Sequence, residues 1–428
     1  MVIDPLSGDA TSFLRRGGTI AERGERFLAW QRERESYGLW PEAAAAPCLA
    51  FTGRDALALA AEPVVVAKAL EALERCAHLG GVPKDRSVAA LESALAALLD
   101  MPAAVAFASG TAALSGTMSA VVGQGDFIVL DDGVGPALRH AAAASGARVL
   151  RLRAGAGPDL GEVLRAARRH APQSAILVAT ETLSITHAAQ PDIADWRAAC
   201  DAEAAALLVD ATHDLGTAGP GGTGLLGMQG ALALPDIVAG SLGRGFAASG
   251  GFACFASPAV AALVRSVAPV RAAAGPILPW CAAAALAALE LVVCDEGAAR
   301  RASLAQRSRH LRARLGGLAA PGPDAAVVLL PVTGAAVARR TMRRLHREGI
   351  ALDLVEPPLA PRGRPLLRMR LSVRHAMADI DRAAASVRMA LAGARDERGL
   401  YLPPQAVPRV AAHVAPAVAC APLLRVVT

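Results

Sequence analysis

The chain has 428 residues, of which 54% are hydrophobic and 19% charged, and this composition is typical of a globular protein and excludes a disordered one. The 44 basic and 38 acidic residues give a net charge of +6, but the arginines are scattered and aromatic residues make up only 3%, so no nucleic-acid-binding surface is predicted. The dispersed cysteines favour free thiols, no signal segment opens the chain, and no apolar run reaches the ~20 residues of a membrane span, so we expect a cytoplasmic protein with no membrane span.

The first part of the chain is predicted to be helical. Residues 1–48 form a polar arm, within which Glu22–Glu35 has the spacing of an amphipathic helix. Two further helices are expected at Pro63–His78 and Ser87–Leu99, separated by a loop that contains Gly80 and Gly81.

Short apolar runs then alternate with helices, which indicates an α/β domain built on a mostly parallel sheet, here assigned to residues 49–295. Ligands of such sheets bind at the carboxyl ends of the strands. Polar residues that we place at these ends are Ser109, Asp131, Glu181, Asp210 and Ser241.

A smaller α+β domain is predicted for residues 296–395. Cys281–Leu315 is expected to form one long helix or two in succession, followed by strands at Ala325–Pro331 and Leu366–Leu371 and a closing helix at Asp379–Leu391. Residues 396–428 are rich in Pro, Ala and Val and are predicted to form a tail.

The segment Gly240–Gly251 places a basic residue between small residues, before a Ser-Gly-Gly turn. In enzymes that use pyridoxal phosphate (PLP), a segment of this kind carries the lysine that forms a Schiff base with the cofactor. Here the basic residue is Arg244, and the whole chain contains only two lysines, Lys68 and Lys84.

Other residues are candidates for binding the same cofactor. Ser109-Gly110-Thr111, between a strand and a helix, has the pattern of a phosphate-binding turn, and Ser241 can add a hydroxyl. Asp210 at a strand end can bind a pyridine nitrogen, and Glu181 lies at a neighbouring strand end. No metal site is predicted, because the histidines and cysteines lack metal-ligand spacing.

The sequence does not decide between two possible roles for each of two further residues. His213 is a candidate general acid or base near neutral pH, although a lone histidine is more often structural. Arg368 alternates with apolar residues and is either a clamp for a substrate carboxylate or a solvated arginine on an edge strand.

Taken together, these motifs resemble the α-oxoamine synthase family of fold-type I PLP enzymes, from about Leu49 to Leu391. The resemblance implies a fold like that of aspartate aminotransferase. It also implies decarboxylative condensation of an amino acid with an acyl thioester, carried by CoA or a carrier protein. Arg368 corresponds to the family's carboxylate-binding arginine, and Arg244 to its Schiff-base lysine.

The chain departs from the family at several of these positions. Besides Arg244, Gly135 lies about where the family stacks a histidine on the pyridine ring, and Ala211 replaces a glutamate. Glu356 stands where several members have arginine. Lys84, in the loop 80–86, is the only lysine near the active site of the family, and it is more simply read as a solvated loop residue.

Three hypotheses follow. The chain is an active acyltransferase that holds PLP without a covalent bond, a non-catalytic subunit of a heterodimer with a lysine-bearing homologue, or a homodimer that keeps the fold for binding. The combined loss of lysine, histidine and glutamate favours the two non-catalytic hypotheses.

Overall fold

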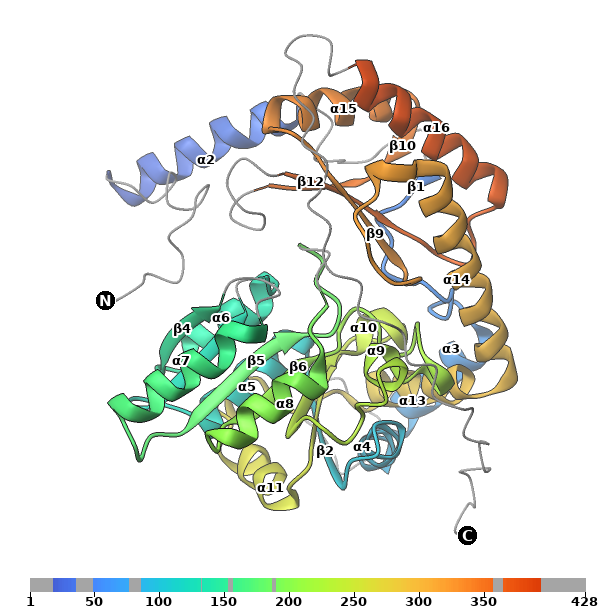
Figure 1. Ribbon diagram of the computed structural model, residues 1–428. Helices are drawn as coiled ribbons and strands as arrows, with labels where there is room; N and C mark the ends of the chain where they lie inside the picture. The colour runs from blue at the N-terminus through green and yellow to red at the C-terminus, as the bar shows by residue number, and fades with distance from the viewer. Residues whose placement is uncertain are drawn as a thin grey trace.

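The computed structural model describes residues 18–35, 49–76, 86–131, 133–152, 157–186, 190–356 and 365–393. Figure 1 shows a larger lobe built on a seven-stranded sheet and a smaller lobe built on a three-stranded sheet, with helix α14 (Asp295–Leu315) running from one lobe to the other.

The large sheet has the strand order β2-β8-β7-β6-β5-β3-β4. All neighbouring pairs between β7 and β4 are parallel, as predicted, but β8 runs antiparallel to both β2 and β7. Strand β8 was not predicted from the sequence, so the sheet is mixed. The strands are β2 (Ala103–Phe107), β3 (Phe127–Asp131), β4 (Arg148–Leu152), β5 (Ile176–Glu181), β6 (Ala206–Asp210), β7 (Ile237–Ser241) and β8 (Gly251–Phe255).

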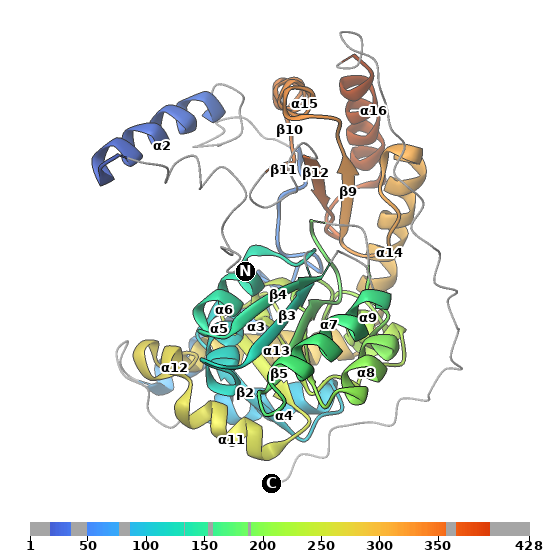
Figure 2. The same cartoon turned by 60° about the vertical axis from the view of Figure 1, so that its left-hand side comes forward.

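Side-chain alternation along these strands divides the core into two layers. Ile128, Leu208 and Ile237 pack on one face and Val129 and Val209 on the other. The first face is covered by α5 (Gly110–Val121), α6 (Pro136–Ala144) and α11 (Pro258–Val267), and α12 (Pro269–Ala274) packs on α5. The second is covered by α3 (Pro63–Cys76), α4 (Arg86–Leu98), α7 (Gly157–His170), α8 (Ile193–Ala202) and α13 (Pro279–Val293), as Figure 2 shows for α7 and α8.

The smaller lobe has the antiparallel order β11-β12-β9, with β9 at Val327–Pro331, β11 at Asp353–Val355 and β12 at Leu366–Arg370. Helices α15 (Ala335–Arg347) and α16 (Met377–Gly393) complete it together with α14. The apolar stretch before it forms two helices, α13 and α14, which separate at Cys294 because that residue has an extended backbone.

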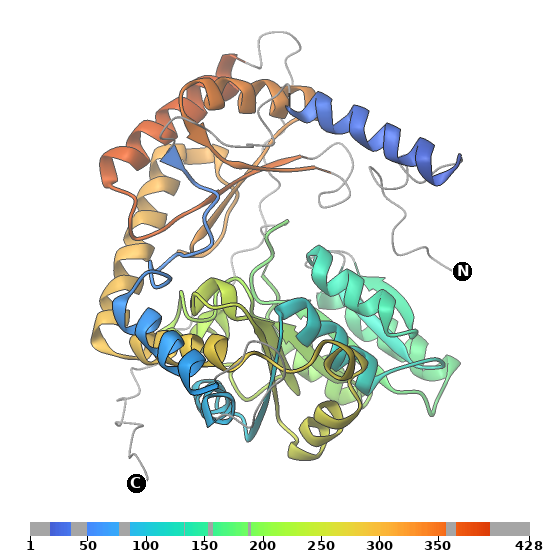
Figure 3. The ribbon, with the colours of Figure 1, turned by 180° about the vertical axis from the view of Figure 1, so that it is seen from behind.

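The segment after residue 48 pairs with the small lobe, although the sequence assigns it to the large domain. β1 (Leu49–Ala50) forms a parallel pair with β10 (Ile350–Ala351), and Arg370 N donates to the carbonyl oxygen of Phe51 at 2.7 Å. Figure 3 shows this segment passing from the small lobe to α3. Among the described residues, the chain therefore crosses between the lobes here and along α14.

The remaining elements are short or peripheral. Helix α2 (Ile20–Glu35) confirms the predicted helix and extends away from both lobes (Figures 1 and 3). None of the described helices is long and apolar enough to cross a bilayer. The short elements around the sheet edge and after α14 are η1 (Pro220–Gly222), α9 (Gly224–Met228), α10 (Leu242–Gly245) and η2 (Gly316–Leu318). The predicted tail lies outside the described residues.

Candidate functional site

The predicted phosphate turn and the end of β7 lie against each other. Ser109 caps α5, its Oγ accepting a hydrogen bond from Ala112 N at 3.1 Å, which leaves the hydroxyl proton free to donate. A Cβ on Gly110 would lie 2.7 Å from the Cβ of Ser241, so only glycine allows this approach. The structure therefore brings Ser109, Gly110 and Ser241 together at the N-terminus of α5, with Thr111 exposed in its first turn.

Two predicted carboxylates lie next to each other. Glu181 ends β5 and Asp210 ends β6, and the two residues are direct partners in the parallel register. Strand alternation places both, together with Ser241, on the face of the sheet that α5 and α6 cover. Both are almost completely buried, with exposures of 4% and 5%.

Burial raises the pKa of both carboxyl groups, because it disfavours their charged forms. Asp210 Oδ1 accepts from Thr212 N at 2.9 Å, yet burial raises the pKa of Asp210 to about 6, opposed in part by these hydrogen bonds and by the charge of Arg244. Burial, and then the negative charge of Asp210, raise the pKa of Glu181 well above its usual range. At neutral pH we therefore expect Asp210 to be mostly ionised, and its charge adds to the burial that raises the pKa of Glu181.

Glu181 also occupies the space beside Gly135. Its Oε1 accepts from Gly135 N at 2.6 Å, and a Cβ on Gly135 would lie 2.8 Å from the same oxygen. Its Oε2 is buried and has no hydrogen-bond partner among the described residues. A side chain at position 135 would therefore have to displace the carboxyl group.

His213 follows β6 and is surrounded by positive charge. Burial, then the charges of Arg244, Arg370, Arg368 and Arg54, hold the pKa of His213 well below its usual value. The imidazole is neutral at pH 7, so it does not titrate near neutrality as the sequence suggested. The neighbouring Thr212 fixes this segment to β7, because its Oγ1 accepts from Ser241 N at 3.0 Å.

Asp214, a third buried carboxylate, lies in the same loop as His213 and stabilises it. Asp214 accepts hydrogen bonds from Leu225 N at 2.6 Å and from the Thr182 hydroxyl. Burial raises the pKa of Asp214 to about 7. Because both of its carboxylate oxygens are used within the protein, we assign Asp214 a structural role.

Arg244 lies on α10, directly after β7, and is half-buried. A Cβ on Gly245 would lie 2.1 Å from the carbonyl oxygen of Leu215, so α10 packs directly on the loop that carries His213. Burial, then repulsion by Arg54 and Arg368, lower the pKa of Arg244 to about 10. Among the described residues, its guanidinium forms no hydrogen bond or ion pair.

Arg368 does not lie on an edge strand, because β12 is the middle strand of its sheet. Asp353 is its direct partner on β11, and the Asp353 Oδ2 atom lies 2.9 Å from an Arg368 Nη and 3.2 Å from Arg370 Nε. The alternative of a solvated edge arginine is therefore wrong. The Arg368 guanidinium already has a carboxylate partner within the chain.

Other predicted positions lie elsewhere. Glu356 is buried and paired with Arg339 on α15 at 3.1 Å. Lys68 is on the exposed side of α3, 2.8 Å from Glu71. Lys84 is outside the described residues, and no group of metal-binding side chains is present among those described.

Sequence reasoning missed Asp353, Arg370, Arg54 and Thr212. The three-residue strand β11 gives no periodic signal, and single arginines carry little information in a chain with so many. The signal that was available for Arg370 is its spacing of two residues from Arg368, which puts both on one face of a strand.

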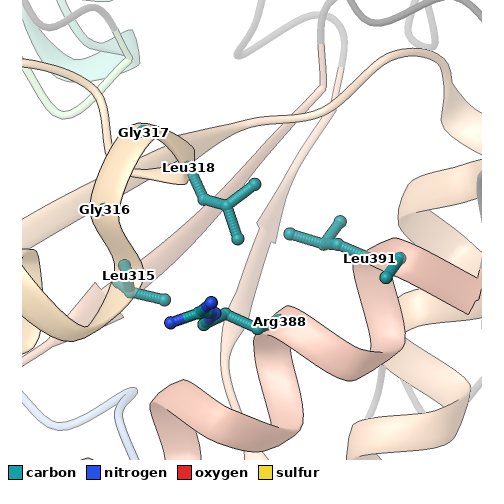
Figure 4. A pocket seen from close by; sticks show the side chains of 7 residues that line it. Leu315, Gly316, Gly317, Leu318, Arg388 and Leu391 are labelled. Carbon is teal, nitrogen blue, oxygen red and sulfur yellow. The ribbon is translucent and has the colours of Figure 1, made fainter.

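A separate cavity of about 330 Å³ lies in the small lobe (Figure 4). Leu318 and Leu391 face each other across it, between η2 and α16. None of the predicted site residues lines it: Leu315, Gly316, Gly317, Leu318, Arg388, Leu391 and Ala392. The polar residues at the edge of the large sheet therefore remain the candidate site.

Comparison with known proteins agrees with this fold. Residues 57–387 match the family model described as aminotransferase class I and II. An 8-amino-7-oxononanoate synthase of Methylobacterium nodulans is 35% identical over 381 residues, covering 87% of this chain and 89% of its own length. The chain belongs to the α-oxoamine synthase branch of the class I and II aminotransferase family.

Solved structures confirm the fold. A serine palmitoyltransferase from S. paucimobilis, with bound PLP–myriocin aldimine, superposes with a TM-score of 0.80 at 20% identity, covering 88% of this chain and 99% of that one. An 8-amino-7-oxononanoate synthase from Francisella tularensis superposes with a TM-score of 0.69 at 18% identity, covering 81% and 98%. The predicted fold-type I architecture of this α-oxoamine synthase relative is thus confirmed.

Proposed function

We propose that this α-oxoamine synthase relative is a non-catalytic binding subunit that has lost lysine-based PLP chemistry. The observation that carries the proposal is Arg244 on α10, at the end of β7, where the resemblance places the Schiff-base lysine. With a pKa of about 10 its guanidinium stays protonated at neutral pH and does not form an imine.

The site retains part of what PLP needs. The Ser109 and Ser241 hydroxyls and the first N–H groups of α5 would hold a phosphate, and Asp210 would face a protonated pyridine nitrogen. When bound in this family, PLP supplies an electron sink for the amino-acid substrate. These residues fit a cofactor held without a covalent bond, but they offer no amine for attachment.

Two further features support the loss of catalysis. Gly135 offers no ring to stack on the cofactor, and the Glu181 carboxyl group takes up the space at its Cα. The neutral His213 can accept or donate a hydrogen bond, but burial and then four arginines lower its pKa and disfavour its charged form. It is therefore a poor general acid at neutral pH.

Absorbance spectroscopy with added PLP tests the proposal. The wild-type protein should show no visible imine band, and borohydride should fix no cofactor to it. Arg244→Lys should gain both signals, because the lysine would lie beside an intact phosphate turn. An Arg374→Lys variant, on the exposed surface, is the matched control and should gain neither.

The opposite results have clear meanings. A stable borohydride adduct of the wild type at Lys84, or turnover of an amino acid with an acyl thioester by this chain alone, would show an active enzyme and overturn the proposal. Assembly is tested by co-expression with a lysine-bearing homologue. Co-purification in a fixed ratio supports a heterodimer, and a stable homodimer supports a binding protein.

A further inference from the structure

Four arginines from three separate segments interact electrostatically, and two of them contact the same carboxylate. We name Arg54, Arg244, Arg368 and Arg370 the arginine cluster. Arg368 and Arg370 are two residues apart on β12, so their side chains lie on one face of the strand, and both contact the Oδ2 atom of Asp353. Asp353 is the only carboxylate that forms an ion pair with the cluster within the described part of the chain.

Arg54 reaches the cluster through the segment that follows β1. The Phe51 carbonyl accepts from Arg370 N at 2.7 Å, and the Ala56 carbonyl accepts from Val373 N at 2.9 Å. Residues 51–56 therefore run beside the end of β12, with Arg54 exposed between these two contacts.

Arg244 completes the cluster from the large lobe. Arg54 and Arg368 lower its pKa by repulsion, and Arg368, Arg244 and Arg54 in turn repel Arg370, whose pKa burial lowers to about 9. All four also act on His213. The four guanidinium groups thus act on one another and on the imidazole, and α10 brings Arg244 against the loop that carries His213, since a Cβ on Gly245 would lie 2.1 Å from the carbonyl oxygen of Leu215.

The charges of this cluster do not balance. Four guanidinium groups face the carboxylate of Asp353 and, beside Arg244, that of Asp210, which leaves two positive charges. Arg370 is buried and Arg244 is half-buried. Concentrating like charges away from water is unfavourable unless a counter-charge is supplied. A bound anion with more than one negative charge would supply it.

We propose that the arginine cluster is a binding site for a small dianion, either a dicarboxylate or a phosphate monoester. The planar guanidinium fork matches both groups in a bidentate geometry. Arg368 alone would suffice for a single carboxylate, whereas Arg54, Arg244 and Arg370 are in excess of that need. Asp353 holds the two strand arginines in place and competes with the ligand for them.

Isothermal titration calorimetry and thermal shift at constant ionic strength test this site. The probes are succinate as a dicarboxylate, inorganic phosphate, and acetate as a single-charge reference. We expect at least one dianion to bind at least tenfold more tightly than acetate and to raise the melting temperature. Binding of succinate alone identifies a dicarboxylate site, and binding of both probes a general dianion site. Because the turn at Ser109 would also hold a phosphate, binding of phosphate alone identifies a phosphate site in the cluster only if Arg54→Gln weakens it.

Variants distinguish binding at the arginine cluster from a non-specific effect of positive charge. Arg54→Gln should weaken binding of the dianion at least fivefold, and Asp353→Asn should strengthen it by removing the competing carboxylate. Arg374→Gln removes one exposed positive charge four residues after Arg370 and should leave binding unchanged. Because Arg54 is exposed, its variant should fold even if the buried arginines do not tolerate substitution.

The proposal is overturned if no dianion binds more tightly than acetate, or if Arg54→Gln and Arg374→Gln behave alike. It is also overturned if sodium chloride of equal ionic strength gives the same thermal shift. The outcome is independent of the PLP experiment, because dianion binding is measured without cofactor and without any absorbance change.

Discussion

The buried carboxylate at the end of β6 should make the protein less stable as the pH rises. The pKa of Asp210 is raised from 3.8 to about 6, so the folded protein binds this proton more tightly than the unfolded chain does. The resulting stabilisation is complete below about pH 4 and is lost as the pH rises through about 6. Asp210→Asn removes the titrating group but keeps an oxygen that can accept from Thr212 N.

The size of the effect follows from the two pKa values. A rise from 3.8 to about 6 corresponds to about 3 kcal/mol of unfolding free energy, of which about 1.5 kcal/mol is lost between pH 5 and pH 8. At pH 8 we therefore expect Asp210→Asn to be more stable than the wild type by up to about 3 kcal/mol. The unfolding free energy of Asp210→Asn should still depend on pH, but less steeply than that of the wild type, because Glu181 and Asp214 are also buried.

Urea unfolding of the cofactor-free protein at several pH values measures this difference. The control is Asp100→Asn, at an exposed position where the backbone φ of 54° suits asparagine as well as aspartate. This control should keep the pH dependence of the wild type. If Asp210→Asn also keeps that dependence, or is less stable than the wild type at pH 8, the electrostatic reasoning is refuted.

Two further predictions concern the contact between Gly251 and Ser109 and the ion pair between Glu92 and Arg265. Gly251→Ala would place a Cβ 2.2 Å from the carbonyl oxygen of Ser109, so we expect a loss of about 2–4 kcal/mol in urea unfolding, whereas Gly123→Ala meets open space and should be nearly neutral. Glu92→Gln breaks a bidentate contact to the Arg265 guanidinium at 2.7 and 3.0 Å, which we expect to cost about 1–3 kcal/mol; a melting temperature equal to that of the wild type would contradict this.

Most of the large sheet could be predicted from the sequence because each parallel strand is a short apolar run buried on both faces. The same logic placed Glu181, Asp210 and Ser241 at one edge, since parallel strands end together. Strand β8 was missed because Gly251 follows a glycine-rich turn and masks the start of the apolar run.

The charged part of the site was harder to predict. Asp353 lies on a strand of three residues, too short for any period to be recognised. Arg54 and Arg370 come together only because β1 pairs with β10 and brings residues 51–56 beside β12. This contact joins segments about 320 residues apart, and no local pattern specifies it.

The position of β8 also has a consequence for how the chain is made. β2 has β8 as its only neighbour in the sheet, and about 140 residues separate the end of one from the start of the other. At roughly 5–20 residues per second, the ribosome needs on the order of ten to thirty seconds to produce that stretch. During this time β2 has no partner strand from its own sheet, and the turn at Ser109 cannot form its contact with Gly251. The newborn chain thus carries an unpaired apolar strand for about a third of its synthesis, a natural target for chaperones.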